Sequence, residues 1–148
     1  MVASLAMRPS LSALALTLAA LALACSKPPD ISGELDDYAY QINDVAAETC
    51  ECPQDVGYAT YAECVDDLSV TDAERDCRAT VLEGHEEAGK EYLDCAVEAL
   101  NGYVDCLAMN PGCADGWWAD CTSAYLDTVG GCPQLPSAVA EDFAQCDL

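Results

Sequence analysis

The residues of this chain that could do chemistry are its cysteines. Ten of the 11 cysteines lie beyond residue 30: Cys50, Cys52, Cys64, Cys77, Cys95, Cys106, Cys113, Cys121, Cys132 and Cys146. Thiolates bind metal ions, whereas oxidised cysteines form disulfides, so the compartment decides between the two. An even number of cysteines in an exported chain indicates a disulfide framework.

A four-residue word, aromatic-x-acid-Cys, recurs around these cysteines. It occurs at residues 61–64, 92–95, 103–106 and 118–121, and in a looser form at 143–146. Residues three apart share one face of a helix, so we expect each aromatic ring to cover the disulfide beside it. We therefore interpret the word as a helical disulfide cassette and not as a catalytic motif.

The amino-terminal sequence predicts export. Residues 11–24 contain only Leu, Ala, Ser and Thr, which suits the apolar part of a signal peptide and is too short for a membrane span. The end of this run, Leu21-Ala-Leu-Ala-Cys25, resembles the lipobox of bacterial lipoproteins. The resemblance implies that Cys25 carries the lipid and that Ser26 favours the outer membrane, on its periplasmic or cell-surface side. A plain secretory signal is the alternative, and Met7 is an alternative start.

These features predict three segments. Residues 1–24 form the signal peptide, residues 25–31 the lipidated cysteine and a short linker, and residues 32–148 a single domain. The whole chain carries 27 acidic and five basic residues, a formal net charge of −22. Such a chain repels nucleic acid and anionic lipid heads and attracts basic proteins and other cations. It also repels itself, and disulfides worth about 2 to 4 kcal/mol each would offset that repulsion.

A long central helix is predicted to carry several of the cysteines. Residues 71–109 contain no proline, begin with a capping box of Thr71 and Glu74, and end at an Asn-Pro-Gly turn. Gly84 and Gly89 are the places where we expect any bend or break. The fold class is therefore all-α, a small disulfide-laced bundle of about five helices around this central helix.

The other helices are expected from about residue 32 to 50, 58 to 69, 115 to 130, and from 137 onward. The first of them should bury Leu35, Tyr38, Ile42 and Val45. Residues equidistant from a hairpin turn face each other, which predicts the bridges Cys64–Cys77, Cys95–Cys121 and Cys106–Cys113. The remaining cysteines, Cys50 and Cys52, are expected to pair with Cys132 and Cys146, in an order that symmetry leaves open.

Other chemistry finds less support. Cysteines on helix faces resemble those of the bacterial copper-storage four-helix bundles, yet neither Cys-x-x-x-Cys nor Cys-x-x-Cys occurs. His85 is the only histidine, expected as a half-buried packing residue between Val81 and Ala88. No catalytic serine motif or phosphate loop occurs, so an unrecognised enzyme would have to be built around His85.

The sequence therefore predicts a non-catalytic, lipid-anchored envelope protein that serves as an acidic binding or scaffolding module, with no cofactor and no metal site. The alternative is a cysteine-based copper or zinc binding protein. Two aromatic residues are candidates for partner binding. Trp117 either covers the turn at Pro111 or stands exposed as an anchor, and Tyr40 lies on the polar side of the first helix.

Overall fold

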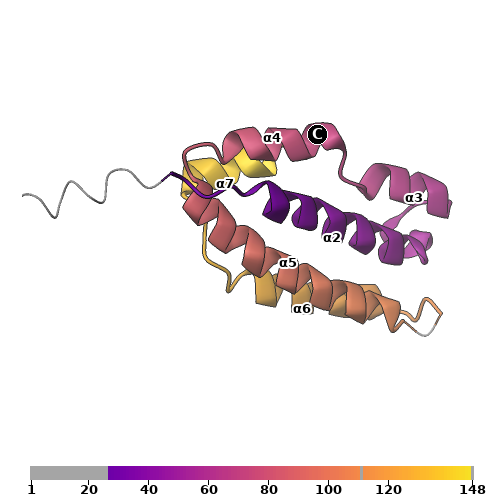
Figure 1. Ribbon diagram of the computed structural model, residues 1–148. Helices are drawn as coiled ribbons and strands as arrows, with labels where there is room; N and C mark the ends of the chain where they lie inside the picture. Colours follow the sequence, from indigo (N-terminus) through magenta and orange to yellow (C-terminus); the bar gives the residue numbers. More distant parts are fainter. Residues whose placement is uncertain (1–26, 111, 148) are drawn as a thin grey trace, which may run out of the picture.

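Two long helices, α2 (Ser32–Cys50) and α5 (Glu86–Ala108), pack against each other along the middle of the molecule (Figure 1). The computed structural model describes residues 27–110 and 112–147, and every regular element within these ranges is helical. The shorter elements are η3 (Pro53–Val56), α3 (Tyr61–Leu68), α4 (Asp72–Val81), α6 (Trp117–Val129) and α7 (Ser137–Ala144). The predicted all-α, disulfide-laced bundle is confirmed.

The predicted central helix is two helices, α4 and α5, which are separated by residues 82–85. The expected capping box begins α4, since the Thr71 hydroxyl accepts from the Glu74 amide at 3.2 Å and Glu74 accepts from the Thr71 amide at 2.6 Å. The break falls at Gly84, whose φ of +81° suits glycine and strains other residues. Gly89 lies within α5 instead, where a Cβ would stand 3.1 Å from a methyl of the buried Leu82.

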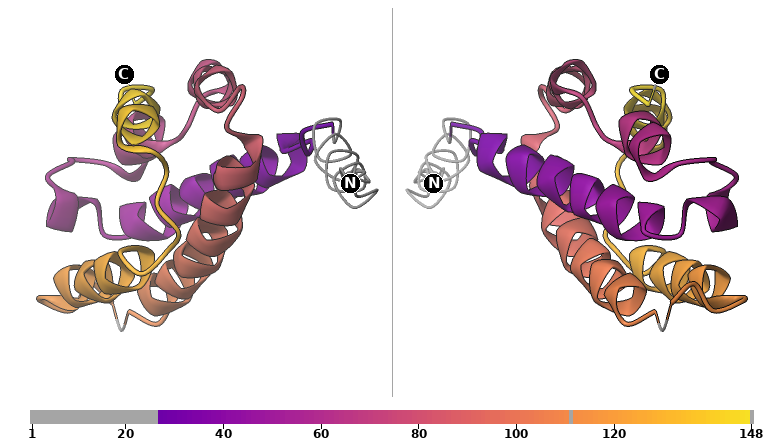
Figure 2. Two further views of the ribbon diagram at one scale, coloured as in Figure 1. Left: turned by 90° about the vertical axis from the view of Figure 1, so that its left-hand side faces the viewer. Right: turned by 90° about the vertical axis from the view of Figure 1, so that its right-hand side faces the viewer.

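The break sends α4 to a different neighbour from the expected one. α3 packs against α2, whereas α4 packs against both α2 and α7. Figure 2 shows the connection after α6 crossing the molecule, so that α7 lies near α4 while α6 stays beside α5. The last helix therefore closes the bundle on the side opposite α6.

The apolar side chains form two separate cores. The first joins the beginning of α2 to α4, α5 and α7 through Ile31, Leu35, Leu82, Leu93, Leu135, Val139 and Phe143. The second joins the end of α5 to α6 through Tyr103, Leu107 and Cys121, with Val45, Trp117, Trp118 and Tyr125 packed against them. The middle of α2 lies between these cores and belongs fully to neither.

All ten cysteines of the described residues form disulfides, as predicted. The pairs are Cys50–Cys64, Cys52–Cys113, Cys77–Cys146, Cys95–Cys132 and Cys106–Cys121. None of the pairings predicted from hairpin symmetry is present: Cys64–Cys77, Cys95–Cys121, Cys106–Cys113 and the cross-bridges from Cys50 and Cys52 to Cys132 and Cys146 are all wrong.

Two physical reasons account for these errors. Because the break at Gly84 turns α4 toward α7, Cys77 meets Cys146, and α3 is left to join the end of α2 through Cys64. The hairpin of α5 and α6 does exist, but its centre lies between residues 113 and 114, the midpoint of both the Cys106–Cys121 and the Cys95–Cys132 bridges. The expected centre, the Asn-Pro-Gly sequence at residues 110–112, lies about two to three residues too early.

Candidate binding surface

Acidic groups dominate the surface because acids far outnumber bases and three of the basic residues are already paired. Arg75 bonds Asp36 at 2.5 Å and Asp76 at 2.9 Å, and Lys90 pairs with Glu34 and with Asp94. Arg78 pairs with Asp147. These three cations engage five of the 27 acids, so the surface keeps a large excess of negative charge.

The structure separates the two aromatic candidates. Tyr40 is 62% exposed on α2 and is free to meet a partner. Trp117 is half-buried against the second core, and its indole N–H donates to the Cys106 carbonyl at 2.9 Å. Trp117 is thus held at the end of α5 as a packing residue and not as an exposed anchor.

His85 is exposed, which corrects its expected role in packing. It stands at the N-cap of α5, within the break between α4 and α5, and therefore does not lie on an apolar helix face.

The disulfides bear on the alternative of a metal-binding protein, because all ten sulfur atoms are bonded in pairs and none is a thiolate ligand. Within residues 27–110 and 112–147, no group of three His, Cys, Asp or Glu residues is placed to hold a metal ion.

The aromatic residues surround one bridge as the repeated word predicts. Cys106 and Cys121 lie in the second core with Tyr103 and Trp118, the aromatic residues of their own two words. Tyr103 stacks on Tyr125 with ring centroids 5.0 Å apart. The word at residues 61–64 behaves differently, because Tyr61 is 46% exposed while Cys64 is fully buried.

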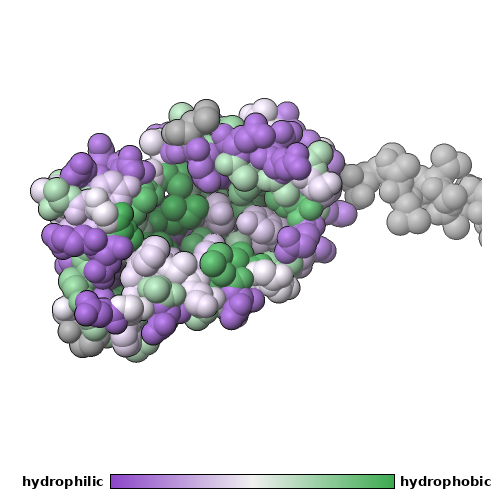
Figure 3. Space-filling model, turned by 180° about the vertical axis from the view of Figure 1, so that it is seen from behind, coloured by the Kyte–Doolittle hydropathy of each residue, from purple (hydrophilic) through white to green (hydrophobic). Residues whose placement is uncertain are grey.

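A hollow runs along the middle of α2. Figure 3 shows it from behind as a group of hydrophobic residues within a hydrophilic rim. One part, of about 370 Å³, is apolar and is lined by Ile42, Val45, Ala46, Thr49, Val56, Tyr58, Leu68, Tyr103 and Trp118. A second part, of about 390 Å³, is lined by Tyr38, Ile42, Asp67, Leu68, Ser69, Val70, Glu74, Arg78 and Asp147. Because Ile42 and Leu68 line both parts, we treat them as one feature, the α2 groove.

The groove exists because the apolar stripe of α2 is longer than the part of it that the two cores cover. Leu35 is buried as predicted, but Tyr38, Ile42 and Val45 are only half-buried. The expectation that this helix buries all four side chains is therefore wrong. It assumed one continuous core, whereas the two cores cover the ends of α2 and leave the middle of its apolar stripe open.

Two hydrogen bonds fix the wall of the groove opposite α2. The Asn43 side-chain oxygen accepts from the Val70 amide at 2.7 Å, which ties the connection between α3 and α4 to α2. The Tyr58 hydroxyl donates to Asp67 and so links the apolar part of the groove to the charged part. This bond to a carboxylate raises the pKa of Tyr58 above its ordinary value.

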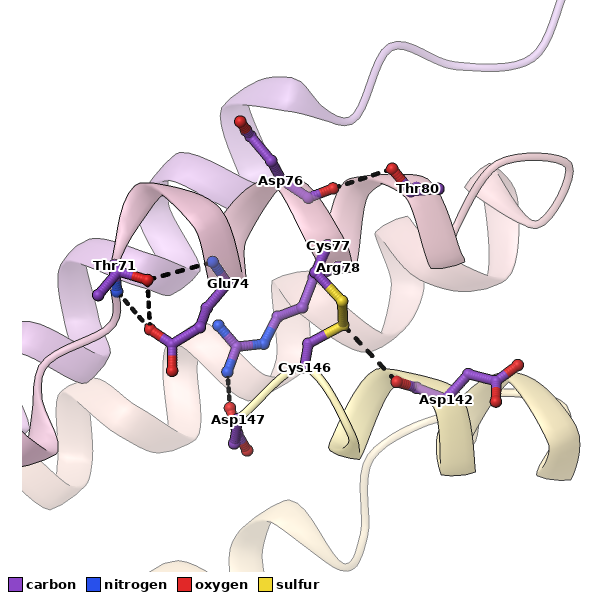
Figure 4. Close-up of a disulfide and its surroundings, with 9 residues drawn as sticks. All are labelled: Thr71, Glu74, Asp76, Cys77, Arg78, Thr80, Asp142, Cys146 and Asp147. Atoms are coloured by element: carbon purple, nitrogen blue, oxygen red, sulfur yellow. Dashed lines mark hydrogen bonds and ion pairs between the residues drawn. A yellow bond between two sulfur atoms is a disulfide. The ribbon is translucent and has the colours of Figure 1, made fainter.

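Arg78 is the one buried cation of the described residues, with 3% of its side chain exposed. Its guanidinium lies 5.8 Å from the ring centre of Tyr38 and 5.6 Å from that of Phe143, within the range of cation–π attraction. Figure 4 shows it reaching from α4 toward Asp147, beside the Cys77–Cys146 bridge. Nη2 donates to Asp147, whereas Nε and Nη1 have no hydrogen-bond partner in the described part of the chain.

Sequence reasoning missed both the groove and Arg78. The available signal was helical spacing, because Arg78 precedes the buried Leu82 by four residues and so shares its inward face. Burial also raises the pKa of the neighbouring Tyr38, which therefore stays neutral beside the guanidinium.

No protein-family model, no curated protein and no solved structure matches this chain. Its five disulfides indicate an oxidising compartment outside the cytosol, so the chain is exported. Among the described residues, no helix has the length and apolar character needed to cross a bilayer. The predicted signal peptide and Cys25 lie outside the described residues.

Proposed function

We propose that this protein is a non-catalytic, lipid-anchored module of the bacterial outer membrane that binds a basic partner through its acidic surface. The observation that carries the proposal is the distribution of charge. Intramolecular ion pairs engage three of the basic side chains, those of Arg75, Arg78 and Lys90. Most of the acidic side chains are exposed to solvent. Opposite charge on a partner would raise the rate of association and relieve the self-repulsion of this chain.

The proposed anchor would hold the domain close to the membrane. Ile31 already belongs to the first core, so only residues 26–30 would separate it from a lipidated Cys25. A fully extended spacer of this length reaches about 20 Å. An acidic domain held so near to anionic lipid heads would turn its most negative faces away from the bilayer, where a soluble partner could meet them.

Intact mass spectrometry of protein purified from the bacterial envelope tests the anchor. We expect acyl chains on Cys25, loss of this added mass in Cys25→Ala, and no alkylation of the other ten cysteines before reduction. An unmodified Cys25 would contradict the lipid anchor. Labelling of most of the ten cysteines would contradict the disulfide framework and would restore thiolate metal binding as the leading function.

Calorimetric titration with a capped oligolysine peptide tests the binding role, with capped oligoglutamate as the matched control. We expect the lysine peptide to bind at low ionic strength and to weaken steeply as salt rises, because exposed charges are screened. Absence of lysine-peptide binding at low salt, or equal binding of the glutamate peptide, would overturn the proposed function.

A further inference from the structure

We propose that the α2 groove binds an extended apolar segment of a basic polypeptide, and that Arg78 donates hydrogen bonds to a backbone carbonyl of that segment. This inference rests on the proposed function, because it gives the basic partner a specific point of attachment. Three properties of the groove carry it: an apolar floor that is only partly covered, donors in its wall that have no partner among the described residues, and an acidic rim.

The floor of the groove is an apolar helix stripe that is only partly covered, because Tyr38 packs against the first core and Val45 against the second, whereas Ile42 belongs to neither. Tyr38, Ile42 and Val45 recur at steps of four and three along α2, the spacing of a face that packs against another element. Tyr103 and Trp118 extend this floor onto α5 and α6. Single exposed apolar residues such as Leu126 are ordinary, but a contiguous apolar hollow is typical of an interaction site.

The wall of the groove holds donors that need an acceptor. A guanidinium has five N–H donors and no acceptor, and buried donors in folded proteins are almost always paired. Arg78 lines the groove while its Nε and Nη1 lack a partner among the described residues. Both atoms are buried in the unbound protein, so an incoming oxygen atom would satisfy them once the guanidinium turns toward the groove.

The charge around Arg78 determines whether the ligand oxygen that it binds is anionic or neutral. Asp67, Glu74 and Asp147 line the same part of the groove, so one cation faces three acids there. A carboxylate or phosphate ligand would be repelled by this excess, whereas a neutral backbone carbonyl would not. Cationic side chains flanking the carbonyl would in turn be attracted by the acids.

A polypeptide meets these requirements at once. An extended segment presents a carbonyl at every residue and side chains on alternate faces, so leucine-sized groups can enter the hollow while lysines lie over its rim. The two parts of the groove, about 370 and 390 Å³, fall within the usual size range of ligand pockets, about 300 to 1,000 Å³.

The test compares two capped peptides of equal charge by calorimetric titration. One has two leucines flanked by lysines, and the other has serines in place of the leucines. We expect the wild-type protein to bind the leucine peptide at least about tenfold more tightly, with a change in Trp118 fluorescence. Ile42→Asn should remove this preference, whereas the matched control Leu126→Asn, at an exposed position on α6, should keep it.

Arg78→Lys tests the carbonyl contact, because lysine keeps the charge beside Asp147 but lacks the planar fork of donors. We expect about tenfold weaker binding of the leucine peptide and little change for the serine peptide. If this variant fails to fold, amide chemical shifts of the wild-type protein give the answer. The peptide should then perturb residues 38–46 and 67–78, and changes confined elsewhere would overturn the proposal.

The outcomes separate the groove from the proposed function. Equal, salt-sensitive binding of both peptides would overturn the groove and leave the acidic surface as the binding site. Failure of both peptides to bind at low salt would overturn the proposed function itself. Tighter binding of a leucine peptide flanked by glutamates would show that Arg78 receives an anion, which contradicts the inference.

Discussion

Removal of the Cys77–Cys146 bridge should cost about 4 kcal/mol of stability. The bridge spans 69 residues, and a cross-link over this length is worth about 4.4 kcal/mol in the chain-entropy description of the unfolded state. The Cys95–Cys132 bridge shortens the remaining path between the two cysteines to about 32 residues, which lowers the value to about 3.7 kcal/mol. Domains of this size are stable by about 5 to 15 kcal/mol, so the variant should fold but unfold at much lower urea.

Urea unfolding of Cys77→Ala, Cys146→Ala and the double variant measures this cost. Because the two residues share one bond, we expect the double variant to lose about as much stability as either single variant. The matched control removes Cys50–Cys64, which spans 14 residues and should cost about 3 kcal/mol. Additive losses from the two single variants would show that Cys77 and Cys146 belong to different bridges.

The free thiol that Cys77→Ala leaves identifies the disulfide partner of Cys77 independently of the stability measurements. The structure places it at Cys146, whereas the pairing inferred from hairpin symmetry places it at Cys64. Alkylation of the free thiol, followed by reduction and trypsin, separates the two, since cleavage after Arg75 and Lys90 puts Cys64 and Cys146 on different fragments. A label on the fragment that contains Cys64 would refute the arrangement of α4 against α7.

Three further results should follow from the structure. Gly84→Ala should lower the free energy of unfolding by about 1 to 2 kcal/mol in urea titrations, because φ is +81° there, and Gly84→Asn should lower it less. Lys90 lowers the pKa of Glu34 below 4.5, so their pair stabilises the fold above that pH and loses its effect as the pH falls through the folded-state pKa. The stability gap between wild type and Glu34→Gln should thus be present at pH 7 and close as the pH falls through the lowered pKa of Glu34, and a gap that widens in acid would contradict this sign. Raising NaCl from about 10 to 500 mM should increase the urea midpoint, since salt screens the self-repulsion, and a decrease would show that ion pairs dominate.

Local features of the fold could be predicted from the sequence because their causes are local. The capping box at Thr71 depends on two residues three apart, and the break at Gly84 depends on the conformational freedom of one glycine. The use of all ten cysteines in disulfides follows from their even number in an exported chain. Each of these signals involves only a few neighbouring residues.

The pairing of the cysteines and the groove depend on packing between distant elements. No nearby residue indicates that α4 turns toward α7, so the partner of Cys77 could not be found by hairpin symmetry. The wide loop between α5 and α6 likewise moved the centre of a hairpin that was otherwise correctly anticipated. Periodicity identified the apolar stripe of α2, but only the positions of both cores show that Ile42 lies between them.

The order of the bridges along the chain has a consequence for biogenesis. Cys52–Cys113 interleaves with both Cys77–Cys146 and Cys95–Cys132. During export from the amino-terminal end, Cys52 meets oxidant well before Cys113, and Cys77 well before Cys146, so early neighbours form non-native bonds that thiolate attack must later exchange. We therefore expect this protein to depend on a disulfide isomerase as well as an oxidase. In cells without the isomerase, misbridged forms of faster or slower electrophoretic mobility should accumulate, and uniform native protein there would show that folding outpaces oxidation.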